Sequence, residues 1–173
     1  MRNLFGNAVW VPTLAAYYTT SREPGGAWAR VAQAFRAALA EGFDNIACGG
    51  DTGVFAHGNN ALELQLMVQL GADWRRVLQW ATLGGWHCVR SMAWEGEDGA
   101  RRLSRVGELA EDARVVGDNE VPFGILRRGF AADLVATKGD LQQDFGAAVS
   151  HENIVFVMKG GKIYKQNGKE HVP

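Results

Sequence analysis

The chain has 173 residues, enough for one domain with a sizeable hydrophobic core but too few for a large multidomain enzyme. Its 47% hydrophobic and 21% charged residues are typical of a globular protein and argue against disorder over the whole length. The net charge of −1 lacks the basic excess that binding to a phosphate backbone requires, so we expect no nucleic-acid partner.

Two further features bear on the cellular location. The longest uncharged run, residues 3–21, contains several Asn and Thr residues and Pro12, so it is too polar for a membrane span and lacks a signal-peptide cleavage site. Cys48 and Cys88 are far apart and form no CxxC motif, which favours a reducing environment. We therefore expect a cytoplasmic protein without a membrane partner.

The first half of the chain alternates between short apolar runs and helical patterns. The run Val9-Trp10-Val11 predicts a buried strand, and apolar residues spaced three and four apart over residues 28–39 predict a helix that ends at Gly42. Residues 45–48 predict a second strand, and the pattern from Asn60 to Gly71 predicts a second helix. Strands that alternate with helices favour a parallel α/β sheet.

The second half of the chain changes character. Asp73 can cap a third helix that ends at Gly84-Gly85, and the highly charged residues 95–114 predict a solvated helix or a flexible insertion. The loop Gly160-Gly161 predicts a β-hairpin between the runs on either side. From Val121 onward, short β-rich runs alternate with glycine turns, at residues 123–126, 132–136, 154–158 and 162–164.

The most specific local feature is the run Gly49-Gly50-Asp51-Thr52-Gly53. It places a carboxylate at the carboxyl end of a predicted parallel strand, where α/β sheets and barrels build their sites. Asp51 is also consistent with a simple turn or helix cap, a frequent use of Asp beside Gly. His57 follows in the same loop and could reach a substrate, although a lone loop histidine is more often a plain surface residue.

Other chemistry is not indicated by the sequence. There is no HExxH, CxxC, GxGxxG or GxSxG motif. His87 and Cys88 are adjacent, so their side chains diverge on a regular element and we interpret both as packing residues. His151 and His171 fall in polar turns and are predicted to be inert.

The sequence resembles metal-dependent amidohydrolases of the imidazolonepropionase and prolidase-like group. Residues 46–58, IACGGDTGVFAHG, followed by Glu63, Leu66, Met67, Val68 and Gly71, are similar to the eighth-strand segment of that group, and residues 10–14 are similar to the seventh-strand region. Residues 123–135 and 157–164 look like the strands by which such chains return to a small β-sandwich after the barrel.

This resemblance implies a fold. A full (β/α)8 barrel needs roughly 250 residues, so the resemblance implies an α/β protein that comprises the C-terminal portion of a TIM-type (β/α)8 barrel, its last two strand–helix units, followed by return strands of a small β-sandwich. Residues 1–118 would form the partial barrel and residues 119–173 the sandwich segment.

The resemblance also implies an activity, the hydrolysis of a carbon–nitrogen bond in an amide or dipeptide-like small molecule. It assigns Asp51 as the metal ligand and general base that activates water, His57 as a substrate-binding residue, and a divalent metal, zinc first, as the cofactor. The first-strand HxH pair, the carboxylated lysine and the middle-strand histidines of the group have no counterparts.

We therefore expect the chain alone to hold no metal and to be inactive, and to self-associate or to be complemented by an upstream barrel segment. The alternative is a non-catalytic fragment or pseudoenzyme that acts only by pairing with another chain.

Overall fold

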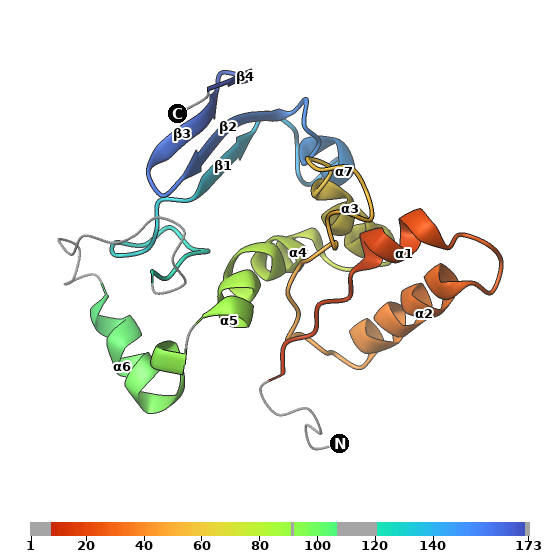
Figure 1. The fold of residues 1–173 in the computed structure, drawn as a ribbon, viewed down its shortest axis with the longest axis horizontal. Helices are drawn as coiled ribbons and strands as arrows, with labels where there is room; N and C mark the ends of the chain where they lie inside the picture. The colour runs from red at the N-terminus through yellow and green to blue at the C-terminus, as the bar shows by residue number, and fades with distance from the viewer. Residues whose placement is uncertain (1–7, 91, 107–120, 172–173) are drawn as a thin grey trace.

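A computed structural model describes residues 8–90, 92–106 and 121–171. The first part of the chain is helical, and residues 134–170 add a four-stranded sheet with one short helix. Figure 1 shows the sheet at one side of the molecule and helices α1 and α2 at the other, with α4 and α5 between them. No helix in the described part of the chain is long and apolar enough to cross a membrane.

The two strands expected at 9–11 and 45–48 are reduced to one parallel bridge between Trp10 and Ile46. The Trp10 amide donates to the Asn45 carbonyl (2.9 Å), and the Ala47 amide donates to the Trp10 carbonyl (3.0 Å). The predicted parallel and adjacent arrangement is therefore confirmed, whereas regular strands are not formed. A parallel ladder gains stability from neighbouring strands on both sides, and none of the described residues supplies another strand here.

Four helices surround this bridge: α1 (Leu14–Thr20), α2 (Ala27–Ala40), α3 (Ala61–Gln69) and α4 (Trp74–Gln79). Helices α2 and α3 confirm the two predicted helical patterns, whereas α1 was not anticipated. The apolar faces of these helices meet in one core, whose large, fully buried apolar side chains are Leu14, Phe35, Ile46, Leu66, Met67 and Val77.

The third predicted helix begins as expected, because the Asp73 carboxylate accepts hydrogen bonds from the amides of Arg75 (2.9 Å) and Arg76 (3.4 Å). The prediction that it ends at Gly84-Gly85 is wrong. The chain continues through a π-helical turn, η1 (Trp80–Gly84), into α5 (Gly85–Val89). Gly84 serves close packing instead, because a Cβ there would lie 2.5 Å from the Ile46 carbonyl oxygen.

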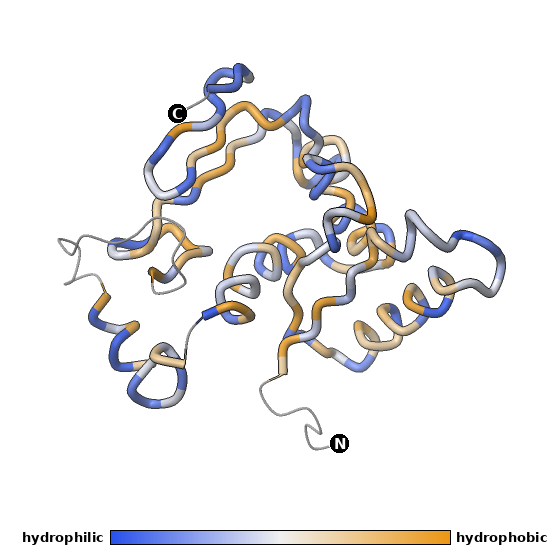
Figure 2. The backbone as a smooth tube through the Cα atoms, viewed as in Figure 1, coloured by the Kyte–Doolittle hydropathy of each residue, from blue (hydrophilic) through white to orange (hydrophobic). Residues whose placement is uncertain are grey.

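A second, smaller core follows α5. It contains Trp86, Trp94 and Val106, and the edges of Trp94 and Phe123 meet the Trp86 ring. The predicted solvated helix is confirmed over α6 (Gly96–Arg105), which comes after the short η2 (Met92–Trp94) and is largely hydrophilic in Figure 2. The rest of the charged segment, from residue 107, lies outside the described residues.

His87 and Cys88 are both exposed, so the interpretation of the two as packing residues is wrong. They lie on the side of α5 that faces away from the second core, whereas the preceding residue, Trp86, is 1% exposed. Neighbouring positions on a helix point about 100° apart, so only one of three consecutive residues can face a given core.

The sheet consists of β1 (Leu134–Thr137), β2 (Ile154–Lys159), β3 (Lys162–Gln166) and β4 (Lys169–Glu170), in that order and antiparallel. The short helix α7 (Phe145–Ala148) lies between β1 and β2. The predicted hairpin at Gly160-Gly161 is confirmed, and both glycines have the positive φ angles (55° and 81°) that its tight turn requires.

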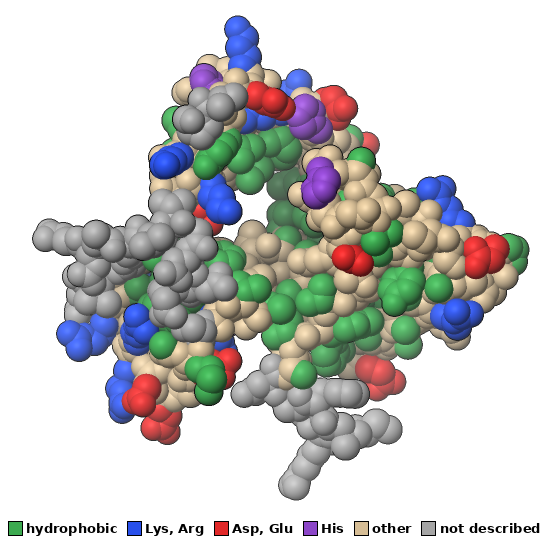
Figure 3. Space-filling view, in the orientation of Figure 1, with side chains coloured by type: hydrophobic (Ala, Val, Ile, Leu, Met, Phe, Trp, Pro, Cys, Tyr) green, Lys and Arg blue, Asp and Glu red, His purple; other side chains and the backbone are tan. Residues whose placement is uncertain are grey.

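The run 123–126, predicted as β-rich, forms no strand, because Gly124 packs against the backbone of Thr82 in η1 with a φ of 95°. A hollow of about 810 Å³ remains between η1, this run and the sheet, and its lining is mostly apolar. Figure 3 shows hydrophobic side chains at the centre of the molecule, where the surface is hollowed.

The described residues thus form a mixed helical and antiparallel-sheet structure. The boundary expected at residues 118 and 119 lies outside the described residues. The assignment of the helical part to a TIM-type barrel stays a prediction, because the parallel pairing in the described chain is limited to Trp10 and Ile46.

Candidate functional site

The candidate site lies where the two bridged segments end. Both segments run in the same direction, so their carboxyl ends emerge at one edge. They stay close beyond the bridge, since a Cβ on Gly49 would come 2.8 Å from a Val11 methyl group. Asp51 follows the second segment and Thr13 follows the first, so both residues lie just beyond this edge, which we call the carboxyl edge.

Asp51 presents an unpaired carboxylate at the carboxyl edge. The residue is exposed, and its side chain has no hydrogen-bond partner among the described residues. Its backbone is left-handed, with φ 59°, and its carbonyl accepts a hydrogen bond from the Val54 amide (3.2 Å). Asp tolerates this conformation better than most residues. The local turn therefore fixes the backbone and leaves both carboxylate oxygens available to a ligand or a proton.

His57 lies in the same loop, which runs from Gly49 to Asn60 and is exposed over most of its length. The loop is anchored by Phe55, whose ring packs on Gly50. His57 is itself exposed, and no hydrogen bond or ion pair joins its side chain to Asp51 in the described part of the chain. The structure thus places the two predicted site residues in one exposed loop, without a hydrogen bond between their side chains.

Glu63 stabilises the carboxyl edge through hydrogen bonds to the start of α1. This residue of α3 is 2% exposed, and its carboxylate accepts hydrogen bonds from the amides of Leu14 (3.0 Å) and Ala15 (2.7 Å) at the start of α1. Burial raises the pKa of Glu63 to about 7, against the lowering effect of those two hydrogen bonds. Glu63 is thus a buried carboxylate that links α3 to α1.

The segment that Glu63 stabilises contains a strained residue. Thr13 has φ 50° and ψ 43°, and a β-branched residue rarely adopts this left-handed conformation. Such strain costs on the order of 1–3 kcal/mol and persists only where surrounding contacts impose it. The two hydrogen bonds to Glu63 begin at the next residue and are the contacts that hold the turn.

Cys48 lies in the second bridged segment, just before the carboxyl edge, and its thiol is unreactive. Its thiol lies 3.5 Å from the Met67 sulfur, and burial, followed by the neighbouring Glu63, raises the pKa of Cys48 to about 12. A thiol in this state carries almost no thiolate near neutral pH, so it is a poor nucleophile and a poor metal ligand.

The donor set of the described residues does not form a zinc site by itself. A catalytic zinc takes three protein ligands, and no group of three or more His, Cys, Asp or Glu residues within 8–90, 92–106 and 121–171 is arranged to hold a metal ion. At the carboxyl edge, Asp51 is the single exposed carboxylate that we identify.

Glu63 and Thr13 were not identified as site residues from the sequence. For Glu63 a signal was present, because it shares the helical stripe of Leu66, Met67 and Leu70 at spacings of three, four and seven. A carboxylate on an apolar stripe must find buried donors. Nothing in the sequence identifies Thr13, because its left-handed conformation is seen only in the structure, next to the two amides that Glu63 binds.

Comparison with known proteins identifies the fold but no family. No protein family and no curated protein matches the sequence. Among solved structures, the chain is similar to a Xaa-Pro dipeptidase that was crystallised with methionine bound in its active site, with 22% sequence identity and a TM-score of 0.55. The match covers 91% of this chain and 34% of the dipeptidase, so this chain shares its fold with about a third of that protein.

Proposed function

We propose that this chain forms part of a hydrolase that acts on carbon–nitrogen bonds of amide or dipeptide-like substrates, with Asp51 as its general base. The observation that carries the proposal is the exposed Asp51 carboxylate at the carboxyl edge, which has no hydrogen-bond partner in the described part of the chain. The fold shared with part of a Xaa-Pro dipeptidase supports it, as does the resemblance of residues 46–58 to the eighth-strand segment of amidohydrolases. In this proposal the helical part corresponds to the last two strand–helix units of a TIM-type barrel.

The chemistry assigned to Asp51 is a proton transfer. Its carboxylate takes a proton from a water molecule while the water oxygen attacks the substrate carbonyl carbon. The protonated Asp51 then returns that proton to the nitrogen as the carbon–nitrogen bond breaks, so the products are a carboxylic acid and an amine. His57, in the same loop, would contact the substrate.

The enzymes that this chain resembles bind a metal, so the proposal must ask which metal ligands this chain supplies. Asp51 would supply one ligand, and the described residues do not complete a set of three. We therefore derive no step through zinc from this chain.

The test is the hydrolysis of dipeptides and N-acyl amino acids by the product of the complete reading frame that contains this chain, with added zinc. We expect turnover that falls about 10²- to 10⁴-fold in Asp51→Asn, because the proton acceptor is lost. Asp98→Asn, an exposed carboxylate on α6, is the matched control and should keep the wild-type rate. Near-normal turnover in Asp51→Asn would contradict the proposal.

A second candidate, a non-catalytic chain that acts by pairing with another chain, is favoured by uncovered apolar surface. Leu126 is 83% exposed and Val135 is 67% exposed, and both line the 810 Å³ hollow beside the sheet. Large exposed apolar patches mark interaction sites. If the complete product forms a stable complex and hydrolyses none of the substrates, the second candidate is supported instead.

A further inference from the structure

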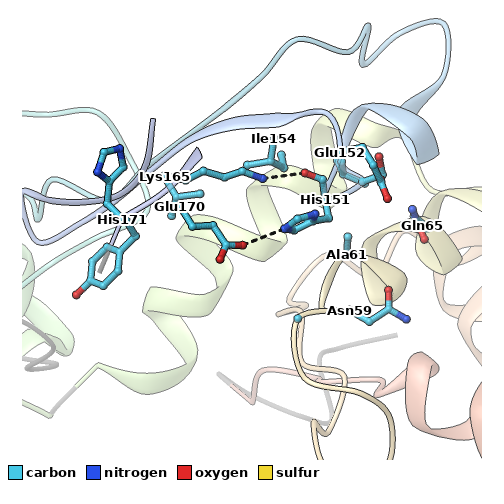
Figure 4. A pocket seen from close by; sticks show the side chains of 14 residues that line it. Asn59, Ala61, Gln65, His151, Glu152, Ile154, Lys165, Glu170 and His171 are labelled. Carbon is cyan, nitrogen blue, oxygen red and sulfur yellow. Dashed lines mark hydrogen bonds and ion pairs between the residues drawn. The ribbon is translucent and has the colours of Figure 1, made fainter. Parts of the chain in front are cut away.

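A second cavity lies beyond the candidate site, where the loop that carries His57 approaches the sheet. It has a volume of about 560 Å³, within the range of small-molecule sites. Three parts of the chain enclose it: residues 58–61 with Gln65 of α3, the turn at residues 149–152, and strands β2 to β4. Figure 4 shows the side chains of these segments around it. Asp51 and His57 do not line it.

A β-bulge directs two side chains of β3 to this cavity. Val157 of β2 pairs with Lys165, whereas the next residue, Met158, pairs with Ile163, so Tyr164 is an extra residue in β3. A bulge of this kind turns neighbouring side chains toward the same side of a sheet. Tyr164 and Lys165 accordingly both line the cavity.

Lys165 is a buried lysine of the cavity lining, and its cross-strand neighbour in β4 is Glu170. Lys165 is 7% exposed, and its ammonium group donates one hydrogen bond, to the His151 carbonyl (3.0 Å). In the described part of the chain no carboxylate forms an ion pair with it. An ammonium group has three N–H donors, and lysine is rarely buried unless it is paired. The ammonium group of Lys165 therefore has N–H donors left for a ligand in the cavity.

Two carboxylates, those of Glu152 and Glu170, also line the cavity, and each has a partner other than Lys165. Glu170 pairs with the exposed His151 ring (3.4 Å) at the rim of the cavity. The pKa of Glu152 is lowered first by its own backbone amide and by the Ser150 side chain, and less by His151 and Lys165. These carboxylates repel any anion, and they repel a doubly charged anion about twice as strongly as a singly charged one, so among anions the site favours a monoanion.

The rest of the lining is suited to an organic molecule. Val149, Ile154 and Val157, which also line the 810 Å³ hollow, contribute apolar surface, and Asn59 contributes an amide. Gln65 donates through Nε2 to the Gly146 carbonyl (2.8 Å), which leaves its Oε1 as an acceptor. The arrangement is thus apolar with a few polar groups, as in small-molecule sites.

We propose that this cavity binds a small organic monocarboxylate, whose carboxylate pairs with Lys165 and whose apolar body packs on Val149, Ile154 and Val157. The inference that His151 and His171 are inert then needs revision, because both line this site. The proposal is independent of the chemistry at Asp51.

The test compares two probes that differ in the carboxylate alone, N-acetyl-L-leucine and its carboxamide, by NMR titration of the full chain. We expect the acid to bind at least about tenfold more tightly than the amide, because a charge-assisted hydrogen bond is lost in the amide. The largest shifts should fall on residues 59–65 and 149–165. Inorganic phosphate should bind more weakly than the acid.

Two variants assign the effect to Lys165. Lys165→Met should weaken binding of the acid about tenfold and leave binding of the amide unchanged. Lys162→Met, an exposed lysine on the same strand outside the cavity, is the matched control and should stay within about twofold of wild type. The comparison of acid with amide needs no variant, so it holds even if Lys165→Met does not fold.

Three results would overturn the proposal. They are equal affinities for acid and amide, no binding of the acid up to about 20 mM, and shifts confined to residues 49–57. The last result would assign the acid to the candidate site at Asp51 instead.

Discussion

Gly84 lies directly against the backbone of Ile46, since a Cβ at position 84 would come 2.5 Å from the Ile46 carbonyl oxygen. Ile46 is the residue that bridges Trp10. The π-helical turn therefore contacts the bridged segment through bare backbone, and the position of the carboxyl edge depends on that contact.

Substitutions at the two neighbouring glycines should have opposite effects. Gly84→Ala should lower the free energy of unfolding by about 1–3 kcal/mol, because the Ile46 segment must move. Gly85 has helical angles and nothing within 4 Å of an added Cβ, so Gly85→Ala should raise the free energy of unfolding by about 0.5–1 kcal/mol. Urea denaturation with unchanged m-values measures both. Equal effects of the two substitutions would contradict the packing described.

The buried Glu63 predicts a pH-dependent stability. Its pKa rises from an ordinary 4.5 to about 7 in the folded chain, so folding favours the protonated form. The stabilisation of the folded chain by protonated Glu63 is complete below pH 4.5 and is lost as the pH rises through 7. The loss is on the order of 3 kcal/mol.

Glu63→Gln isolates this effect. The free energy of unfolding of the variant minus that of wild type should be larger at pH 8 than at pH 5, because Gln has no charge to bury. Urea titrations at a series of pH values measure the difference. Glu41→Gln, at the exposed end of α2, is the matched control and should follow the wild-type profile. A constant offset between Glu63→Gln and wild type across this range would contradict the prediction.

Thr13 predicts a stabilising substitution. Glycine adopts the left-handed conformation without the steric cost that a β-branched residue pays, so Thr13→Gly should raise the free energy of unfolding by up to about 1 kcal/mol. Thr20→Gly, at the last residue of α1, should lower it instead, because it also removes the hydrogen bond from Thr20 Oγ1 to the Ala16 carbonyl. Thermal unfolding of both variants measures the contrast, and a loss of stability in Thr13→Gly would show that the Thr13 side chain makes a contact worth more than the strain.

His57 predicts a kinetic effect different from that of Asp51. If it contacts substrate and takes no part in proton transfer, His57→Ala in the complete product should raise KM about tenfold and change kcat little. Steady-state kinetics with a dipeptide substrate measures both constants. A fall in kcat as large as that of Asp51→Asn would assign His57 to the chemical step.

The uncovered apolar surface predicts self-association of the isolated chain. Val135 is 67% exposed on the edge strand β1, and edge strands with exposed apolar side chains pair with other chains. Sedimentation velocity should show association that increases with concentration and decreases in Val135→Lys. Gln142→Lys, at an exposed polar position, is the control. A monodisperse monomer with a high melting temperature would contradict this prediction.

Local patterns in the sequence predicted the elements that depend on local interactions. The helix over α2, the cap at Asp73 and the turn at Gly160-Gly161 each follow from residues close in sequence. The stop expected at Gly84 failed because the reason for a glycine there lies in a distant carbonyl, that of Ile46.

The candidate site was predictable only in part for the same reason. The sequence placed Asp51 after an apolar segment, and the structure shows that segment ending beside the first one. The roles of Glu63 and Thr13 arise from hydrogen bonds that join residues 48 and 49 positions apart, which no local pattern contains. The position of Lys165 in the cavity could not be predicted from the sequence, because it depends on a bulge in the register of β2 and β3.

The hydrogen bonds of Glu63 also have a consequence for the order of folding. The β2–β3 hairpin closes a two-residue loop, and hairpins of this kind form in about 1–10 μs. The carboxyl edge needs loop closures of 48 and 49 positions, whose entropic cost must be met before the contacts form. The geometry around Asp51 is therefore expected to form late on the folding pathway and to open early in native-state hydrogen exchange, with the Leu14 and Ala15 amides as reporters.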